Sequence, residues 1–187
     1  MSLEDSLVEH CSPTLAGIKT ASLYRFLPED PQQFAHQLKR WREWFALRGL
    51  RLTVLKGCRQ RGDYLLYLFR PRALSRELAR PDVCAFLTSL GYDVSGGCDG
   101  VLRQLSARLC QRPEFPHEIG VVLGYPLEDV VGFIENGGKN YTCCGCWKSY
   151  GDPDEARRRF SSYRACTAAY KRSYASGVGV VQLTAAV

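Results

Sequence analysis

Residues 21–69 read ASLYRFLPEDPQQFAHQLKRWREWFALRGLRLTVLKGCRQRGDYLLYLF, and this stretch decides the fold. Residues 21–26 suit a strand, and the apolar runs at 50–56 and 64–69 suit two more. A loop at 58–63 separates the last two runs, and its glycine is typical of a hairpin connection. The sequence therefore predicts three strands that lie close together along the chain.

A helix is expected between the first two strands. Its apolar residues recur at spacings of four, three and four, which is typical of one face of an α-helix: Phe34, Leu38, Trp41 and Phe45. Asp30 is placed to cap a helix over 32–48, and Gly49 is placed to end it. The order strand, helix, strand, strand predicts an α+β fold, in which this helix covers one face of a small antiparallel or mixed sheet.

The rest of the chain is expected to be mostly helical and to complete a single compact domain over residues 1–187. In this division, 1–70 is the sheet-forming part, 71–175 the helical part, and 176–187 a tail that is either an edge strand or disordered. Pro13 and Gly17 are expected to break regular structure within 11–20. The predicted helices cover 3–10, 75–80, 83–90, 99–111, 117–123, the stretch from Pro126 to the glycines at 137 and 138, and the stretch that follows Pro153.

The helix after Pro153 carries an aromatic stripe. Its members alternate four and three residues apart: Ala156, Phe160, Tyr163, Thr167, Tyr170 and Tyr174. Core packing is the expected use of such a stripe, and cofactor stacking is the alternative. Cys166 follows Tyr163 by three residues and is placed to face the same groove.

The composition, 45% hydrophobic and 24% charged, is ordinary for a soluble globular protein. The net charge of +6 attracts anions but is well short of that of a dedicated nucleic-acid binder, so no nucleic-acid partner is expected. The polar start lacks a signal peptide, and nine cysteines then indicate a reducing, cytoplasmic compartment. No apolar run approaches the ~20 residues of a membrane-spanning helix, so no membrane role is expected.

The chemistry is expected in residues 120–150, GVVLGYPLEDVVGFIENGGKNYTCCGCWKSY. A helix here runs into a glycine-rich turn and then into Cys143, Cys144 and Cys146. The spacings C-x-x-C and C-x-C let two thiolates reach one soft metal ion or form a disulfide. Nearby Lys139 and Lys148 favour the thiolate form by charge.

Zinc or iron is the metal that this cluster would hold. A closed structural site has four ligands, and no second C-x-x-C occurs in the chain. The missing ligands would come from distant positions, with Cys166 predicted and Cys11, His10 and His117 as further candidates. The alternative is that the cysteines are small residues of a tight turn without any ligand.

Cys11 is a candidate nucleophile, because His10 and Ser12 flank it and Lys19 is near in sequence. A reactive thiolate needs a nearby cation or helix dipole, and a base that meets it in space. A buried structural thiol is the alternative.

Two blocks of this sequence, CSPTLAG with Lys19 and LGYPLEDVVGFIENGGKN with the following WK, resemble an uncharacterised family of small cytosolic proteins from anaerobic bacteria. The resemblance implies no activity, cofactor or substrate. Because members do not all carry the cysteine triplet, it implies that metal binding is particular to this chain. It points instead to a shared functional surface made of Cys11, Ser12, Lys19, Asn136, Lys139, Asn140, Trp147 and Lys148.

Three functions follow from these observations. The first is a thiol-based redox or metal-binding role centred on the cysteine loop at 136–151. The second is a non-catalytic module that binds a small anionic ligand or a protein partner. The third is an enzyme with Cys11 as its nucleophile, and the sequence leaves open whether the protein is an enzyme.

Overall fold

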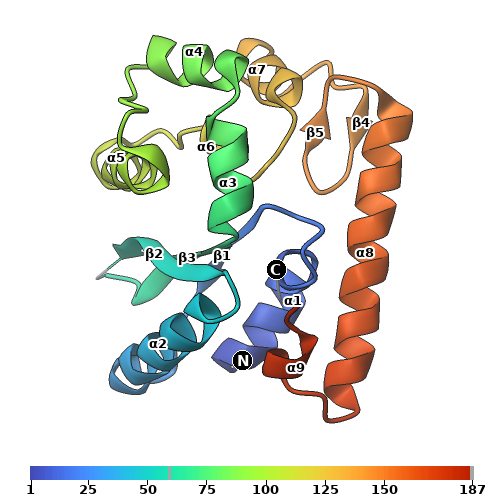
Figure 1. The fold of residues 1–187 in the computed structure, drawn as a ribbon. Coiled ribbons are helices and arrows are strands. Elements are labelled where there is room, and N and C mark those ends of the chain that lie inside the picture. Colours follow the sequence, from blue (N-terminus) through green and yellow to red (C-terminus); the bar gives the residue numbers. More distant parts are fainter. Residues whose placement is uncertain (59, 186–187) are drawn as a thin grey trace.

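The computed structural model describes residues 1–58 and 60–185, and it places a three-stranded sheet between two groups of helices (Figure 1). This arrangement confirms the predicted α+β class. The elements are α1 (Leu3–Leu15), β1 (Ala21–Phe26), α2 (Pro31–Ala46), β2 (Arg51–Cys58), β3 (Asp63–Phe69), α3 (Pro71–Leu78), α4 (Pro81–Ser89), α5 (Gly97–Gln111), α6 (Ile119–Val122), α7 (Leu127–Glu135), β4 (Cys143–Cys144), β5 (Lys148–Ser149), α8 (Pro153–Ala175) and α9 (Val180–Leu183).

The sheet is antiparallel throughout, with the strand order β1-β3-β2. Tyr24 of β1 lies opposite Leu66 of β3, and a register shift interrupts the β2 pairing between Val54 and Lys56. The predicted order of strand, helix, strand and strand is confirmed. The predicted hairpin loop contains residue 59, which is outside the described residues.

Each face of the sheet carries its own apolar core. Successive side chains of a strand point to opposite faces. Accordingly, Leu66 and Leu68 of β3 join the core with α1 and α2, whereas Tyr67 and Phe69 join the core with helices α3 to α7. Burying one such side chain contributes roughly 1.5–3 kcal/mol. The prediction that α2 covers one face is correct, and the later helices cover the other.

Helix α1 is longer than the sequence predicts. It continues through Pro13 to Leu15, so the expected break at Pro13 is wrong. The buried guanidinium of Arg70 donates to the carbonyl oxygens of Thr14 and Leu15, at 2.8 and 2.7 Å. These bonds satisfy the end of the helix, where the last carbonyl groups have no partner within the helix. A tertiary contact thereby stabilises what local sequence preference opposes.

The tail is neither an edge strand nor disordered through residue 185. After Gly177, which has a φ of 94°, it forms the short helix α9 beside α1. The amide of Ala185 then donates to the carbonyl oxygen of Leu15 at 3.0 Å. Residues 186 and 187 are outside the described part of the chain.

Helix α8 is the longest element and runs along one side of the molecule, against α1 (Figure 1). Its N-cap Asp152 accepts a hydrogen bond from the amide of Asp154 at 2.8 Å. No helix within the described residues is both long enough and apolar enough to cross a membrane.

Candidate functional site

A pocket of about 350 Å³ lies where α1, β1, the β4–β5 hairpin and α8 meet. It is called the basic pocket below, because four side chains that line it are bases and none is an acid. The lining residues are His10, Pro13, Lys19, Ser22, Cys146, Tyr163, Arg164, Thr167, Ala168 and Lys171.

Lys19 is the most constrained cation of this pocket. Its ammonium nitrogen lies 5.5 Å from the ring centre of Tyr125 and 5.8 Å from that of Tyr163, which are cation–π distances. Burial lowers the pKa of Lys19. The nearby Cys146 and Cys11 act in the opposite direction and raise this pKa, because a thiolate attracts the ammonium charge. Among the described residues, Lys19 has no salt bridge.

The other bases differ in how they are engaged. Lys171 forms an ion pair with Glu9, whereas Arg164 has no such partner in the described part of the chain. The ring of His10 stacks on Tyr24 at 4.9 Å, and partial burial lowers its pKa, so His10 is neutral at pH 7. The pocket therefore presents two uncommitted cations, Lys19 and Arg164.

The β4–β5 hairpin, residues 143–149 and here called the cysteine hairpin, is held in place by Asp129. Only 3% of Asp129 is exposed. Its carboxylate accepts from the indole nitrogen of Trp147 at 2.6 Å, the hydroxyl of Ser149 at 3.0 Å and the amides of Tyr150 and Gly151 at 2.6 and 3.1 Å. One carboxylate of α7 thus fixes the strand that leads out of the hairpin.

Aromatic packing fixes the other side of the hairpin. Trp147 stacks on Tyr125 at 4.6 Å and meets Phe160 of α8 edge-on at 4.5 Å. A Cβ atom at Gly145 would lie 2.2 Å from the ring of Phe160, a distance that no side chain accommodates. Gly145 is therefore required by close packing against α8, and this packing brings Cys146 to the pocket.

Cys11 lies below the surface beside this pocket. It is 0% exposed, and burial raises the pKa of its thiol to about 12. A nucleophilic thiolate has a lowered pKa and is accessible, so the surroundings of Cys11 are those of a structural thiol. The neighbouring Ser12 is also buried, and its hydroxyl donates to the carbonyl oxygen of Val8 within α1.

The predicted metal ligands do not converge. Within residues 1–58 and 60–185, no group of three or more His, Cys, Asp or Glu side chains is placed to hold a metal ion. Cys143 and Cys144 are neighbours on one strand, so their side chains point to opposite faces of the hairpin. The predicted set, which adds Cys146 and the half-buried Cys166 of α8, therefore does not fit a zinc or iron centre.

The other predicted surface residues split into two groups. Lys19 and Trp147 lie at the basic pocket or directly behind it. The second group surrounds the turn after α7, where Asn136, Gly137, Gly138 and Asn140 end the helix and Lys139 is exposed. Lys148 belongs to this second group, since its ammonium group donates to the carbonyl oxygen of Gly138 at 2.7 Å. The neighbours Trp147 and Lys148 therefore contact different parts of the molecule.

Several pocket residues were not expected from the sequence. Tyr163 and Thr167 belong to the aromatic stripe of α8, for which core packing was expected, yet they border the pocket. Arg164 and Lys171 are seven residues apart and share a helix face, which is a weak sequence signal. Tyr125 and Asp129 lie in the LGYPLEDVVGFIENGGKN block, but the sequence assigned them no part in the site, because their contacts come from distant segments.

The fold and the pocket define a single-domain α+β protein with a basic, ligand-sized cavity. Residues 7–184 match the family described as Protein of unknown function (DUF3793), and the chain belongs to that family. No curated protein matches the chain, and no solved structure matches it.

Proposed function

We propose that this protein is a binding module for a small anionic ligand, which it holds in the basic pocket. The observation that carries the proposal is the ammonium group of Lys19, which two tyrosine rings hold beside a cavity lined by bases without an acid. A desolvated cation is costly to keep without a partner. An anion in the pocket would remove that cost.

The surroundings of Lys19 favour a phosphate, sulfate or carboxylate group. The Arg164 guanidinium offers the planar pair of donors that binds such oxyanions. Thr167 and Ser22 add hydroxyl groups, and that of Ser22 already shares a hydrogen bond with Thr14 at 2.9 Å. The volume of about 350 Å³ is at the lower end of the range for ligand pockets, which suits a small molecule.

Isothermal titration calorimetry with sulfate, inorganic phosphate and succinate tests this proposal. We expect Lys19→Gln to weaken binding by about tenfold or more, because the removed charge faces the ligand directly. Lys139→Gln is the matched control, since Lys139 is exposed on the far turn and does not line the pocket. Lys19→Arg keeps the charge and should restore most of the affinity.

Two results would contradict this function. One is a wild-type protein that binds none of the three anions at millimolar concentration. The other is equal affinity of the Lys19→Gln and Lys139→Gln variants. Circular dichroism and thermal melting of each variant separate a lost ligand contact from a lost fold.

A thiol redox role of the cysteine hairpin is the second candidate, favoured by the exposed Cys146 at the pocket beside Lys19. In this reaction, the thiols of Cys143 and Cys146 form one disulfide, and a small disulfide oxidant takes up two electrons and two protons to leave as two thiols. Mass spectrometry after incubation with oxidised glutathione should show a loss of two hydrogens confined to this pair. A fully reduced hairpin, or a mixture of random pairings, excludes the role.

A further inference from the structure

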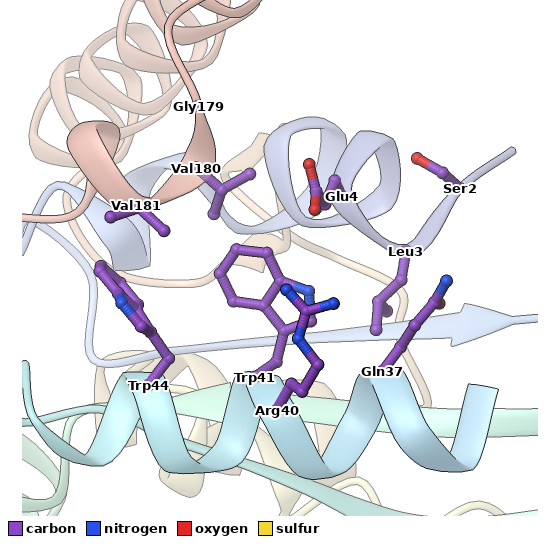
Figure 2. Close-up of a pocket in the computed structure, with 10 residues that line it drawn as sticks. All are labelled: Ser2, Leu3, Glu4, Gln37, Arg40, Trp41, Trp44, Gly179, Val180 and Val181. Atoms are coloured by element: carbon purple, nitrogen blue, oxygen red, sulfur yellow. The ribbon is translucent and has the colours of Figure 1, made fainter. Parts of the chain in front are cut away.

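A second pocket, of about 370 Å³, lies at the other end of α1 (Figure 2). It is called the tryptophan pocket below. Figure 2 shows side chains of α2 rising toward the start of α1 and toward α9, which close the pocket from above. The lining residues are Ser2, Leu3, Glu4, Gln37, Arg40, Trp41, Trp44, Gly179, Val180 and Val181.

The apolar part of this pocket packs against the core that α1 and α2 share. The Trp41 ring lies 6.0 Å from that of Trp44 and 5.1 Å from that of Phe45, and Phe45 is fully buried. Val180 of α9 is 1% exposed and belongs to the same core. The indoles are thus held by packing, and their half-buried faces offer an apolar surface to a ligand.

The polar part carries one charge of each sign. Arg40 belongs to α2 and Glu4 to the first turn of α1, and neither has an ion pair within the described residues. Neighbouring charges are already engaged. Asp5 accepts from the amide of Ser2 at 3.0 Å, and Arg48 lies over Trp44 at 5.0 Å. Arg40 and Glu4 therefore remain for a ligand.

From this juxtaposition we infer that the tryptophan pocket binds a small zwitterion with an apolar side chain, either an α-amino acid or a short peptide. The carboxylate of the ligand pairs with Arg40, its ammonium group with Glu4, and its side chain lies on Trp41 and Trp44. Glu4 would repel an anion that has no ammonium group, and Arg40 would repel a cation that has no carboxylate. This inference does not depend on the function proposed for the basic pocket.

Calorimetric titration of the full chain with L-leucine, L-phenylalanine and L-leucyl-L-leucine tests the inference. Removal of either charge by Arg40→Gln or Glu4→Gln should weaken binding by about tenfold, because one charged group of the ligand then loses its partner. Lys39→Gln is the matched control, since Lys39 precedes Arg40 on α2, is exposed and does not line the pocket. If the dipeptide binds more tightly than the amino acids, the ligand of this pocket is a short peptide.

Ligands with a single charge sharpen the test. We expect 3-phenylpropionate, which lacks the ammonium group, and phenethylamine, which lacks the carboxylate, to bind the wild type about tenfold more weakly than L-phenylalanine does. The inference is overturned if no zwitterion of the panel binds at millimolar concentration, or if the Arg40→Gln and Glu4→Gln variants bind as the control does.

Discussion

The two pockets lie at opposite ends of helix α1, and they differ in the balance of their charges. The basic pocket, near His10 and Pro13, carries bases alone, whereas the tryptophan pocket, near Glu4, joins one base and one acid to two indoles. The same helix contributes to both. The two ends of α1 thus meet different partners: α8 adds Arg164 and Lys171 to the basic pocket, whereas α2 adds Arg40 and the two indoles to the tryptophan pocket, beside Glu4 of α1 itself.

The pockets also differ in what holds their walls. The cysteine hairpin depends on the hydrogen bonds to one buried carboxylate, that of Asp129. The α9 wall depends on the segment that follows it, where the carbonyl oxygen of Ala185 accepts from Arg70 at 3.1 Å. Because Asp129 stabilises one wall and Arg70 the other, we predict that a mutation can abolish ligand binding in one pocket and leave it intact in the other.

The largest effect is expected for Asp129→Ala. The change leaves the indole of Trp147 and the amide of Tyr150 without their acceptor, and we expect the free energy of unfolding to fall by about 3 kcal/mol. Chemical denaturation measures this loss. Sulfate binding should disappear with the displaced hairpin, while L-leucine binding should stay within about twofold of the wild type.

Glu128→Gln is the control for this change, because Glu128 is the exposed neighbour of Asp129 on α7. Equal stability of the two variants would show that Asp129 does not anchor the hairpin. Loss of both ligands in the Asp129→Ala variant would show that the pockets are not independent.

A somewhat smaller effect is expected for Arg70→Met. The change removes the donors to Thr14, Leu15 and Ala185 but keeps an apolar side chain, and we expect a loss of about 2 kcal/mol in unfolding free energy. Hydrogen exchange of residues 180–185 should accelerate, and L-leucine affinity should fall more than sulfate affinity. Unchanged exchange in this segment would contradict the role of Arg70.

A change of pH should alter sulfate affinity by a few-fold and leave L-leucine affinity nearly unchanged. Partial burial lowers the pKa of His10, which faces Tyr24, Glu9 and Lys171, so the imidazole gains its proton only at a pH below the ordinary range of histidine. The added charge attracts an anion, and we expect sulfate affinity to rise roughly threefold from pH 7 to pH 5. At alkaline pH, sulfate affinity should fall as Lys19, whose pKa burial lowers, loses its proton before an exposed lysine would.

His10→Gln should abolish the acidic part of this pH dependence in a calorimetric series. Binding of L-leucine should stay level over the same pH range, because neither His10 nor Lys19 lines the tryptophan pocket. Parallel pH profiles for sulfate and L-leucine would contradict the distinction between the pockets.

The smallest difference between sulfate and L-leucine affinity is expected when the salt concentration changes. Raising sodium chloride from about 0.05 to 0.5 M shortens the screening length, so sulfate affinity should fall by roughly threefold. L-leucine affinity should change by less than about 1.5-fold, since attraction and repulsion by one charge of each sign nearly cancel at long range. Calorimetric titration at three salt concentrations measures how the affinity of each ligand depends on salt. An equal dependence for sulfate and L-leucine would contradict the distinction between the pockets.

Much of the fold could be predicted from local patterns. The strand at 21–26, the central strand at 64–69 and the helix with Trp41 and Phe45 on its apolar face all form where the periodicity placed them. The glycines at 137 and 138 do end α7, with φ values of 56° and 74°. These features depend on a few neighbouring residues, and local sterics and amphipathicity are sufficient to specify them.

The candidate site could be predicted only in part. Lys19 and Trp147 were expected to act together, and the basic pocket brings them near each other through Tyr125. The cysteine cluster was expected to gather ligands, but strand alternation points adjacent thiols apart. Arg164 had only the weak signal of a helix face shared with Lys171, because its place at the pocket depends on how α8 packs against α1.

By itself, the sequence determined the α+β class, the positions of the sheet strands and the turn that precedes the cysteines. The tertiary structure alone decided that Cys11 is buried, that α1 passes through Pro13, and that Lys19 lies between Tyr125 and Tyr163. The physical reason is the range of the interactions. Periodicity specifies which face of an element is apolar, but the packing of segments far apart in the chain decides what covers that face.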